Sequence, residues 1–414
     1  MKIINNLINK LFVNLEKLNF SWRVIAPTIF ILCISCLILK NTNPNIPFFV
    51  STFSRQLIWI LLGCVMFFMI QWFRVQFLHE YAYHLYLVIM VLIFITLFMP
   101  VIGGSSRWIF IGNLSFQPSE IGKLLLVFTL ARFISDYQGK IDDIKLLLIS
   151  LGMALVPCFI IFIQPDFGTA IVYAFIVLPM LFWGGVQVFY LFSIIAPFIS
   201  IISAFDLTFF SIWMLIFSVV LYLHQPKMVY GSINFLINIF CGALSPFIWN
   251  NILYEHQRNR ILTLLNPMSD PQGTGYQIIQ SMTAIGSGGF WGKGLGSGTQ
   301  TQLRFLPVRD TDFIISVIGE EMGLFGIVLL LIAFSIIFYW LIGFADTISN
   351  RFCSLSLIGF ASILFVHLIV NMGMTVGLFP VTGLPVPFLS YGGSFLLTCF
   401  LILGLANNMI SQNI

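Results

Sequence analysis

The stretch LLLISLGMALVPCFIIFI, residues 146–163, decides the fold because none of its side chains is charged. A second apolar stretch, FGTAIVYAFIVLPMLFWGG at 167–185, follows after a connection of only three residues. An α-helix of about 18–20 residues crosses the hydrocarbon core of a bilayer. The two runs therefore predict a pair of transmembrane helices joined by a tight turn.

The rest of the chain has the same character. Of its 414 residues 59% are hydrophobic and 8% are charged, whereas about a quarter of an ordinary globular protein is charged. Mean hydropathy is +1.01. So few charges cannot cover a water-facing surface. The composition excludes a soluble enzyme, a nucleic-acid-binding protein, a disordered linker and a secreted disulfide scaffold as descriptions of the whole chain.

Apolar runs of spanning length recur along the chain, and one shorter run, 121–134, carries Lys123 and Arg132. We predict an all-α, polytopic integral membrane protein with 10–12 transmembrane helices, built as a single membrane domain over residues 1–414. With the shorter run included, the predicted crossings are 24–39, 57–73, 83–102, 121–134, 146–163, 167–185, 187–205, 207–223, 232–249, 322–344, 352–370 and 388–405.

The distribution of Lys and Arg predicts the orientation. An even number of crossings places both termini on one side, and basic residues gather in the short cytoplasmic loops of membrane proteins. With residues 1–21 inside, ten basic residues lie in inner segments, against Lys40, Arg55 and Arg107 in short outer loops. We therefore expect both termini to be cytoplasmic and the long segment 250–312 to be extracytoplasmic, where long loops often carry function.

An acidic and a basic residue stand together at the start of the run 121–134. Pro118 and Ser119 indicate a helix start, which puts Glu120 and Lys123 at i and i+3 on one face. Ionisable residues inside a span usually mark function, because burying them in hydrocarbon is costly. Two interpretations stay open: a neutralised pair at a helix end, or the lining of a polar cavity near Arg107.

The outer loop holds a second polar group of residues. Asp270 lies between turn-forming residues, with Arg258 and Arg260 upstream. Its local sequence favours a turn or cap residue, while a carboxylate is also a suitable general base.

The outer loop continues into a glycine-rich stretch, GSGGFWGKGLGSG at 286–298, which contains Lys293. It matches neither the P-loop nor the GxGxxG spacing. Its glycines would let the backbone approach a bulky ligand closely, for example a phosphate.

Acidic residues follow the glycine-rich stretch. Asp310 and Asp312 form an Asp-x-Asp pair that could hold a divalent cation, although a cap on the next helix is favoured. Glu320 and Glu321 either face a cavity or form a satisfied pair near the interface. The five histidines are scattered and predict no metal site. Pro and Gly residues in 380–394 predict a broken or re-entrant segment before the last span.

Taken together, these motifs resemble the SEDS family (shape, elongation, division, sporulation), and the wording of GTQ-x-QL and AIGSGG resembles its elongation members. The order and spacing of the motifs hold over nearly the whole chain. They are Arg107-Trp108, FQPSE-x-x-K at 116–123, QPDFGT at 164–169, LNP-x-x-DP-x-G-x-GY at 265–276, QS-x-x-AIGSGG at 280–289, GKG at 292–294, GTQ-x-QL-x-FLP at 298–307, TDF at 311–313, GEE at 319–321, NMGM at 371–374 and LFPVTGLPVPFLSYGGS at 378–394.

The resemblance implies a peptidoglycan glycosyltransferase that polymerises lipid II at the outer face of the bacterial cytoplasmic (inner) membrane. It implies that Asp270 is the essential aspartate and that Glu120 and Lys123 belong to the cavity. It also implies a class B penicillin-binding transpeptidase and other elongation-complex membrane proteins as partners. Basic residues are expected to bind the pyrophosphate of the substrate, alone or with a divalent cation (Mg or Mn): Arg55, Arg107, Lys123, Arg258, Arg260 and Lys293.

The chain departs from the family pattern at two places. Relatives commonly carry Glu and His where this chain has Val308 and Asp310, so no role is expected for those two positions. Residues 206–249 add two apolar segments to the usual ten-span pattern, and a pair of crossings preserves the orientation. The alternatives to an elongation enzyme are a division-type member, a lipid II flippase without chemistry, and a structural recruiter of the transpeptidase.

Overall fold

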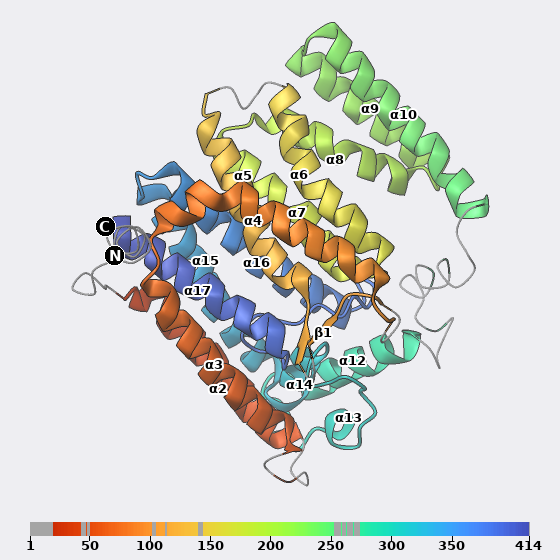
Figure 1. Ribbon diagram of the computed structural model, residues 1–414. Coiled ribbons are helices and arrows are strands. Elements are labelled where there is room, and N and C mark those ends of the chain that lie inside the picture. Colours follow the sequence, from red (N-terminus) through yellow and green to blue (C-terminus); the bar gives the residue numbers. More distant parts are fainter. Residues whose placement is uncertain are drawn as a thin grey trace, which may run out of the picture.

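The computed structural model describes residues 20–42, 47, 50–101, 105–111, 114–139, 144–251, 258, 262, 268 and 274–413. Helices dominate this part of the chain (Figure 1). In chain order they are α2 (Trp22–Thr42), α3 (Thr52–Gln71), α4 (Val75–Ile95), the 3-10 turn η3 (Thr96–Phe98), α5 (Pro118–Asp136), α6 (Ile144–Ile163), α7 (Phe167–Gly184), α8 (Val188–Ser203), α9 (Leu207–His224), α10 (Met228–Asn251), α12 (Thr274–Gly288), α13 (Thr299–Gln302), α14 (Ile314–Glu321), α15 (Gly323–Thr347), α16 (Arg351–Thr375) and α17 (Gly393–Asn413).

The all-α polytopic prediction is confirmed, because a helix overlaps each of the twelve predicted ranges. Among the described residues, ten helices are long and apolar enough to cross a membrane. The other two are α8, with 16 residues, and α5, whose polar side chains lower its hydropathy. The only paired strands in the described ranges are β1 (Ile109–Ile111) and β2 (Leu114–Phe116), a short antiparallel hairpin that the sequence analysis did not predict.

The centre of the bundle is formed by α5, α7 and α16, and α17 packs along α3 on one side of it (Figure 1). In the 18-residue apolar stretch of α16, 89% of the residues are buried inside the protein. Glycines allow the closest helix contacts: Gly63 lies against the ring of Phe400, and Gly393 lies against Trp59. Small residues at helix interfaces are the usual means of close packing in membranes.

The two ends of the described chain lie on the same side of the bundle. The Ser21 backbone N–H donates to the side chain of Asn407 at 2.8 Å, and Asn408 donates to the Phe73 carbonyl at 2.8 Å. The start of α2, the end of α3 and the end of α17 therefore meet. This is the arrangement expected of an even number of crossings.

The additional segment 206–249 forms α9 and α10, which pack mainly on α8 at one edge of the molecule (Figure 1). Polar side chains hold this three-helix group together: Trp213 donates to Ser200 at 2.8 Å, and Ser200 donates to Asn238 at 2.6 Å. Only 6% of the residues in the apolar stretch of α9 are buried. The exposed apolar faces of these helices suit contact with lipid.

The Pro- and Gly-rich segment before the last helix is irregular, as expected, and α17 begins at Gly393. The predicted crossing 388–405 therefore began too early. Side chains from several helices donate hydrogen bonds to backbone carbonyls of this segment. Irregular backbone inside a membrane protein needs such partners, because no water is there to bind it. Ser35 donates to the Leu389 carbonyl at 2.6 Å, Gln56 to Ser390 at 3.4 Å, and Asn371 to Leu384 at 2.7 Å.

Candidate functional site

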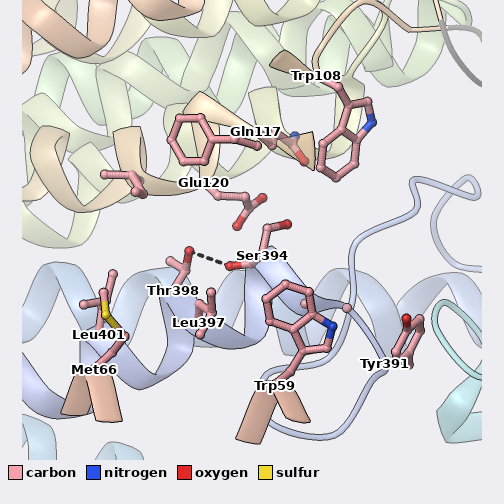
Figure 2. Close-up of a pocket in the computed structure, with 14 residues that line it drawn as sticks. Trp59, Met66, Trp108, Gln117, Glu120, Tyr391, Ser394, Leu397, Thr398 and Leu401 are labelled. Carbon is pink, nitrogen blue, oxygen red and sulfur yellow. Dashed lines mark hydrogen bonds between the residues drawn. The ribbon is translucent and has the colours of Figure 1, made fainter. Parts of the chain in front are cut away.

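A cavity of about 380 Å³ lies between α3, α5, the β1–β2 hairpin and the start of α17. Figure 2 shows Glu120 pointing into it from α5, opposite Ser394 and Thr398 on α17. Its lining combines aromatic and polar side chains with the Gly392–Gly393 backbone. The lining residues are Trp59, Met66, Trp108, Phe116, Gln117, Glu120, Ile121, Tyr391, Gly392, Gly393, Ser394, Leu397, Thr398 and Leu401.

Glu120 and Lys123 form a buried ion pair in which Lys123 Nζ lies 2.8 Å from Glu120 Oε2. Pro118 is the first residue of α5, so the predicted helix start and the i, i+3 spacing are both confirmed. Glu120 lines the cavity, whereas Lys123 is fully buried behind it. Lys123 can therefore act on a cavity ligand only through Glu120. The cavity-lining interpretation holds for the glutamate and not for the lysine.

Asp166 connects the cavity wall to the start of α7. It caps this helix by accepting from Thr169 N, and its Oδ2 accepts from the Gln117 amide at 3.1 Å. Arg107 Nη1 lies 3.3 Å from the same oxygen. Asp166 was not among the predicted site residues, although it lies in the QPDFGT motif. The available signal was a charged residue in the three-residue connection between two predicted spans.

The predicted arginines lie in different surroundings. Arg107 is partly exposed and follows Ser106 beside the cavity residue Trp108. Arg55 is exposed one turn before the cavity residue Trp59 on α3, which places both on one helix face. Arg258 donates to the Asn250 carbonyl at the end of α10, at 2.9 Å. The predicted base Asp270 and the predicted ligand Arg260 lie outside the described residues.

Lys293 is engaged in a second ion pair. Its Nζ lies 2.9 Å from Glu320 Oε1 and donates to Thr299 Oγ1 at 2.9 Å. Glu320 also accepts the backbone N–H groups of Gln300 and Thr301. Burial raises the pKa of Glu320, but these hydrogen bonds and Lys293 outweigh it and hold the pKa below its usual value. Glu320 is therefore a satisfied carboxylate, but its partner is Lys293 and not Glu321, with which the sequence analysis paired it.

Several glycines of the glycine-rich stretch bring its backbone close to other parts of the protein. A Cβ on Gly288 would meet the Gly319 carbonyl, and one on Gly292 would meet the Glu321 carbonyl. Backbone hydrogen bonds join the same segments, from Lys293 N to Glu320 O and from Leu324 N to Gly289 O. Here glycine allows the loop to pair with the α14–α15 junction, which local sequence cannot reveal.

The favoured interpretation of Asp312 as a helix cap is wrong. The residue before α14 is Phe313, and no side chain caps this helix. Asp310 instead lies 3.8 Å from Arg309. Burial raises the pKa of Asp312, against the lowering effects of Thr311 and Arg107. No group of three or more His, Cys, Asp or Glu side chains that could hold a metal ion occurs within the described ranges.

His367 is a site residue that the sequence analysis missed. It lies in the middle of α16, fully buried, and its Nε2 is 3.1 Å from Lys123 Nζ. An ionisable residue within the predicted span 352–370 was the available signal. The assembled site thus offers a carboxylate at a partly aromatic cavity, with Arg55 and Arg107 near its lining residues. Such a site suits a ligand that carries hydroxyl and anionic groups.

The chain is similar to known proteins over most of its length. The model of the FtsW, RodA and SpoVE family, described as a cell cycle protein, matches residues 17–214 and 189–413. The peptidoglycan glycosyltransferase MrdB of Escherichia coli K12 is 36% identical over 321 residues, which cover 77% of this chain and 74% of the relative. The peptidoglycan glycosyltransferase RodA of Treponema pallidum is 30% identical over 387 residues, covering 85% and 88%.

The fold is also found among solved structures. A chain from a peptidoglycan synthase complex, described in terms of coordinated polymerization and crosslinking, superimposes with a TM-score of 0.72 and 27% identity. The superposition covers 96% of this chain and 99% of that chain.

Proposed function

The chain belongs to the FtsW, RodA and SpoVE family of cell cycle proteins, and on this basis we propose that it is a peptidoglycan glycosyltransferase that polymerises lipid II during cell elongation. The observation that carries the proposal is the Glu120 cavity, formed by family motifs that lie far apart in the sequence. A carboxylate, two tryptophans and nearby arginines meet there. This is the chemistry needed to hold a sugar diphosphate attached to a lipid.

The proposed reaction is an inverting displacement. A sugar hydroxyl of the acceptor attacks the anomeric carbon of the donor, the new glycosidic bond forms, and the bond to the diphosphate breaks. Asp270 takes the hydroxyl proton as general base, a contribution worth typically ~10²–10⁴-fold. This role rests on the LNP-x-x-DP motif. An α-linked donor then gives a β-linked product, as a single in-line displacement requires.

The leaving diphosphate needs positive charge. Arg55 and Arg107 lie on the outer side of the cavity, and both are accessible to solvent. Guanidinium groups suit phosphate oxygens because they donate in a fixed planar geometry. Arg258 and Arg260 are proposed to add to this charge from the outer loop. Lys293 is held by Glu320 and would have to leave that pair to bind substrate.

A divalent cation, Mg²⁺ or Mn²⁺, is proposed to accompany the diphosphate. Hard cations prefer oxygen ligands and often bind through substrate phosphates. The oxygens of the substrate diphosphate are proposed as the ligands of the cation. Treatment with EDTA should lower polymerisation, and added Mg²⁺ should restore it. Unchanged activity after EDTA would remove the cation from the proposal.

The proposed setting is the bacterial cytoplasmic (inner) membrane, with both termini in the cytoplasm and the cavity open to the outer side. Ten apolar helices support a multi-pass protein, and the excess of basic residues in the inner segments supports the orientation. The proposed partner is a class B penicillin-binding transpeptidase within a larger elongation complex. A solved relative is a chain of a peptidoglycan synthase complex.

The test is polymerisation of labelled lipid II by the purified protein with its transpeptidase partner. Wild type should give glycan ladders, and Asp270→Ala should abolish them. Asp206→Ala is the matched control, because Asp206 caps α9 at an exposed position outside the cavity. Ladders that persist in Asp270→Ala would exclude Asp270 as the base.

The same preparation separates the alternatives. Transbilayer movement of lipid II without ladders would favour a flippase. Stronger activation by a division-type than by an elongation-type transpeptidase would favour the division-type assignment.

A further inference from the structure

We propose that His367 is a positioning residue of the transfer reaction, which acts through Lys123 to hold the Glu120 carboxylate toward the cavity. The inference rests on the proposed function. Its starting point is a chain of contacts between three elements: His367 Nε2 lies 3.1 Å from Lys123 Nζ on α5, and His367 Nδ1 lies 3.1 Å from the Pro385 carbonyl. The contact with Lys123 is buried, and the contact with the Pro385 carbonyl is partly buried.

The contacts assign the proton on the imidazole. An ammonium group has three donors and no acceptor, so His367 Nε2 must accept from Lys123. A neutral imidazole then carries its proton on Nδ1 and donates it to Pro385 O, which is an acceptor only. His367 therefore forms hydrogen bonds with two partners, the Lys123 ammonium group through Nε2 and the Pro385 carbonyl through Nδ1.

The surroundings of Lys123 leave little freedom for its ammonium group. Glu120 Oε2 lies at 2.8 Å, His367 Nε2 at 3.1 Å, and the centroid of the Phe395 ring at 5.1 Å. The Phe395 ring also stacks on His367 with centroids 4.2 Å apart. Lys123 has no solvent exposure. Without the imidazole, one ammonium donor would face apolar groups, which is costly in a buried site, and the lysine would shift.

A shift of Lys123 would move Glu120, because the two side chains share the ion pair that turns the carboxylate toward the cavity. On its other side, His367 binds the irregular segment that continues to Tyr391 and Gly392 in the cavity wall. One imidazole therefore fixes both a charged group of the cavity and part of its wall. Small misplacements of this kind can cost about 100-fold in rate.

The experiment compares His367→Leu with His367→Gln in full-length protein with its transpeptidase partner. Leucine removes both polar contacts, whereas glutamine keeps one acceptor and one donor. We expect His367→Leu to lower kcat for lipid II polymerisation at least ~10-fold with KM within ~3-fold, and His367→Gln to recover most of kcat. Ser362→Ala is the control on the same helix, because Ser362 bonds only within α16.

A second readout does not depend on activity. Nitrogen NMR of protein labelled at histidine should show His367 protonated at Nδ1 only, and Lys123→Met should change that signal. Wild-type kcat in His367→Leu, equal loss in the leucine and glutamine variants, or a proton on Nε2 would each overturn the proposal. Failure of wild-type protein to polymerise lipid II would instead contradict the proposed function, and the NMR result would still stand or fall separately.

Discussion

Two lysine–glutamate pairs in this protein have the same chemistry and nearly the same length but opposite settings. Lys123 and Glu120 lie 2.8 Å apart, and Lys293 and Glu320 lie 2.9 Å apart. In the Lys293–Glu320 pair, called the outer pair here, the carboxylate accepts hydrogen bonds from two backbone N–H groups, a threonine hydroxyl and the lysine. In the Lys123–Glu120 pair, called the inner pair, the lysine is buried and the carboxylate lines a cavity.

The comparison shows that an ion pair indicates function only when part of it remains available. Glu320, in α14, uses its hydrogen bonds to hold Lys293 of the glycine-rich stretch and the backbone of α13, so its role is structural. Glu120 keeps its place at the cavity because Lys123 and His367 support it from behind.

The largest effect is expected for Glu120→Gln. The change removes the negative charge from the cavity, and we expect polymerisation to fall about 100-fold or more, equivalent to about 3 kcal/mol. It also leaves Lys123 buried without a counter-ion, so thermal stability should fall. The measurements are lipid II turnover and thermal unfolding in the same detergent.

A double variant separates the two effects of that change. Lys123→Met combined with Glu120→Gln removes both charges, so it should regain stability but not activity. Recovery of activity in the double variant would show that Glu120 has no direct role in the cavity.

Gly292→Ala tests the backbone pairing between the glycine-rich stretch and α14, beside the Lys293–Glu320 pair. Gly292 has a φ of +79° and lies against the Glu321 carbonyl. We expect a loss of stability of about 2 kcal/mol or more, because alanine is strained there and its methyl group has no room.

The matched control for this change is Gly286→Ala. Gly286 lies in α12 with nothing within 4 Å of its Cβ position, so alanine should be neutral or should stabilise the helix by up to about 1 kcal/mol. Equal unfolding temperatures for the two variants would contradict the assigned role of Gly292.

Arg107→Gln tests the side of the cavity where the inner pair is open to ligand. The change should raise KM for lipid II about 10-fold through loss of a charged contact to the diphosphate, equivalent to about 1.4 kcal/mol. Asp166 retains Gln117 and Thr169 as partners, so stability should change little. A drop in unfolding temperature with unchanged KM would assign Arg107 to structure instead.

Lys293→Met should have the reverse pattern. We expect a loss of about 1 kcal/mol of stability, because the Lys293 side chain is partly exposed and Glu320 keeps its backbone donors. Turnover per folded molecule should stay within about 3-fold of wild type. A large rise in KM at unchanged stability would restore the sequence-based prediction that Lys293 binds substrate.

The smallest effect concerns acid stability. The pKa of Glu320 lies below its usual value of 4.5, so its contribution is present above that value and is lost as pH falls through the folded-state pKa. Lys293→Met should move this loss to higher pH by removing one lowering influence. Parallel unfolding measurements between neutral and acidic pH would show it. Identical acid profiles would mean that the backbone donors alone set the pKa of Glu320.

Local patterns were enough to predict most of the fold. The apolar runs located a helix at each of the twelve predicted crossings, because spanning length and scarcity of charge are properties of consecutive residues. Pro118 and the spacing of Glu120 and Lys123 predicted the inner pair because three residues along a helix return to the same face. Boundaries near irregular backbone were less accurate, as the late start of α17 at Gly393 shows.

Contacts between distant residues were not accessible in this way. His367 contacts Lys123, which lies 244 residues away in the sequence. Arg107 pairs with Asp166 at the start of α7, and Gly292 lies against the backbone of α14. The sequence by itself determined that this chain has the composition of a membrane protein, where its long apolar helices lie and which motifs it shares. Only the tertiary structure decided which charges face a cavity and which are satisfied internally, because that depends on helix packing that no local pattern encodes.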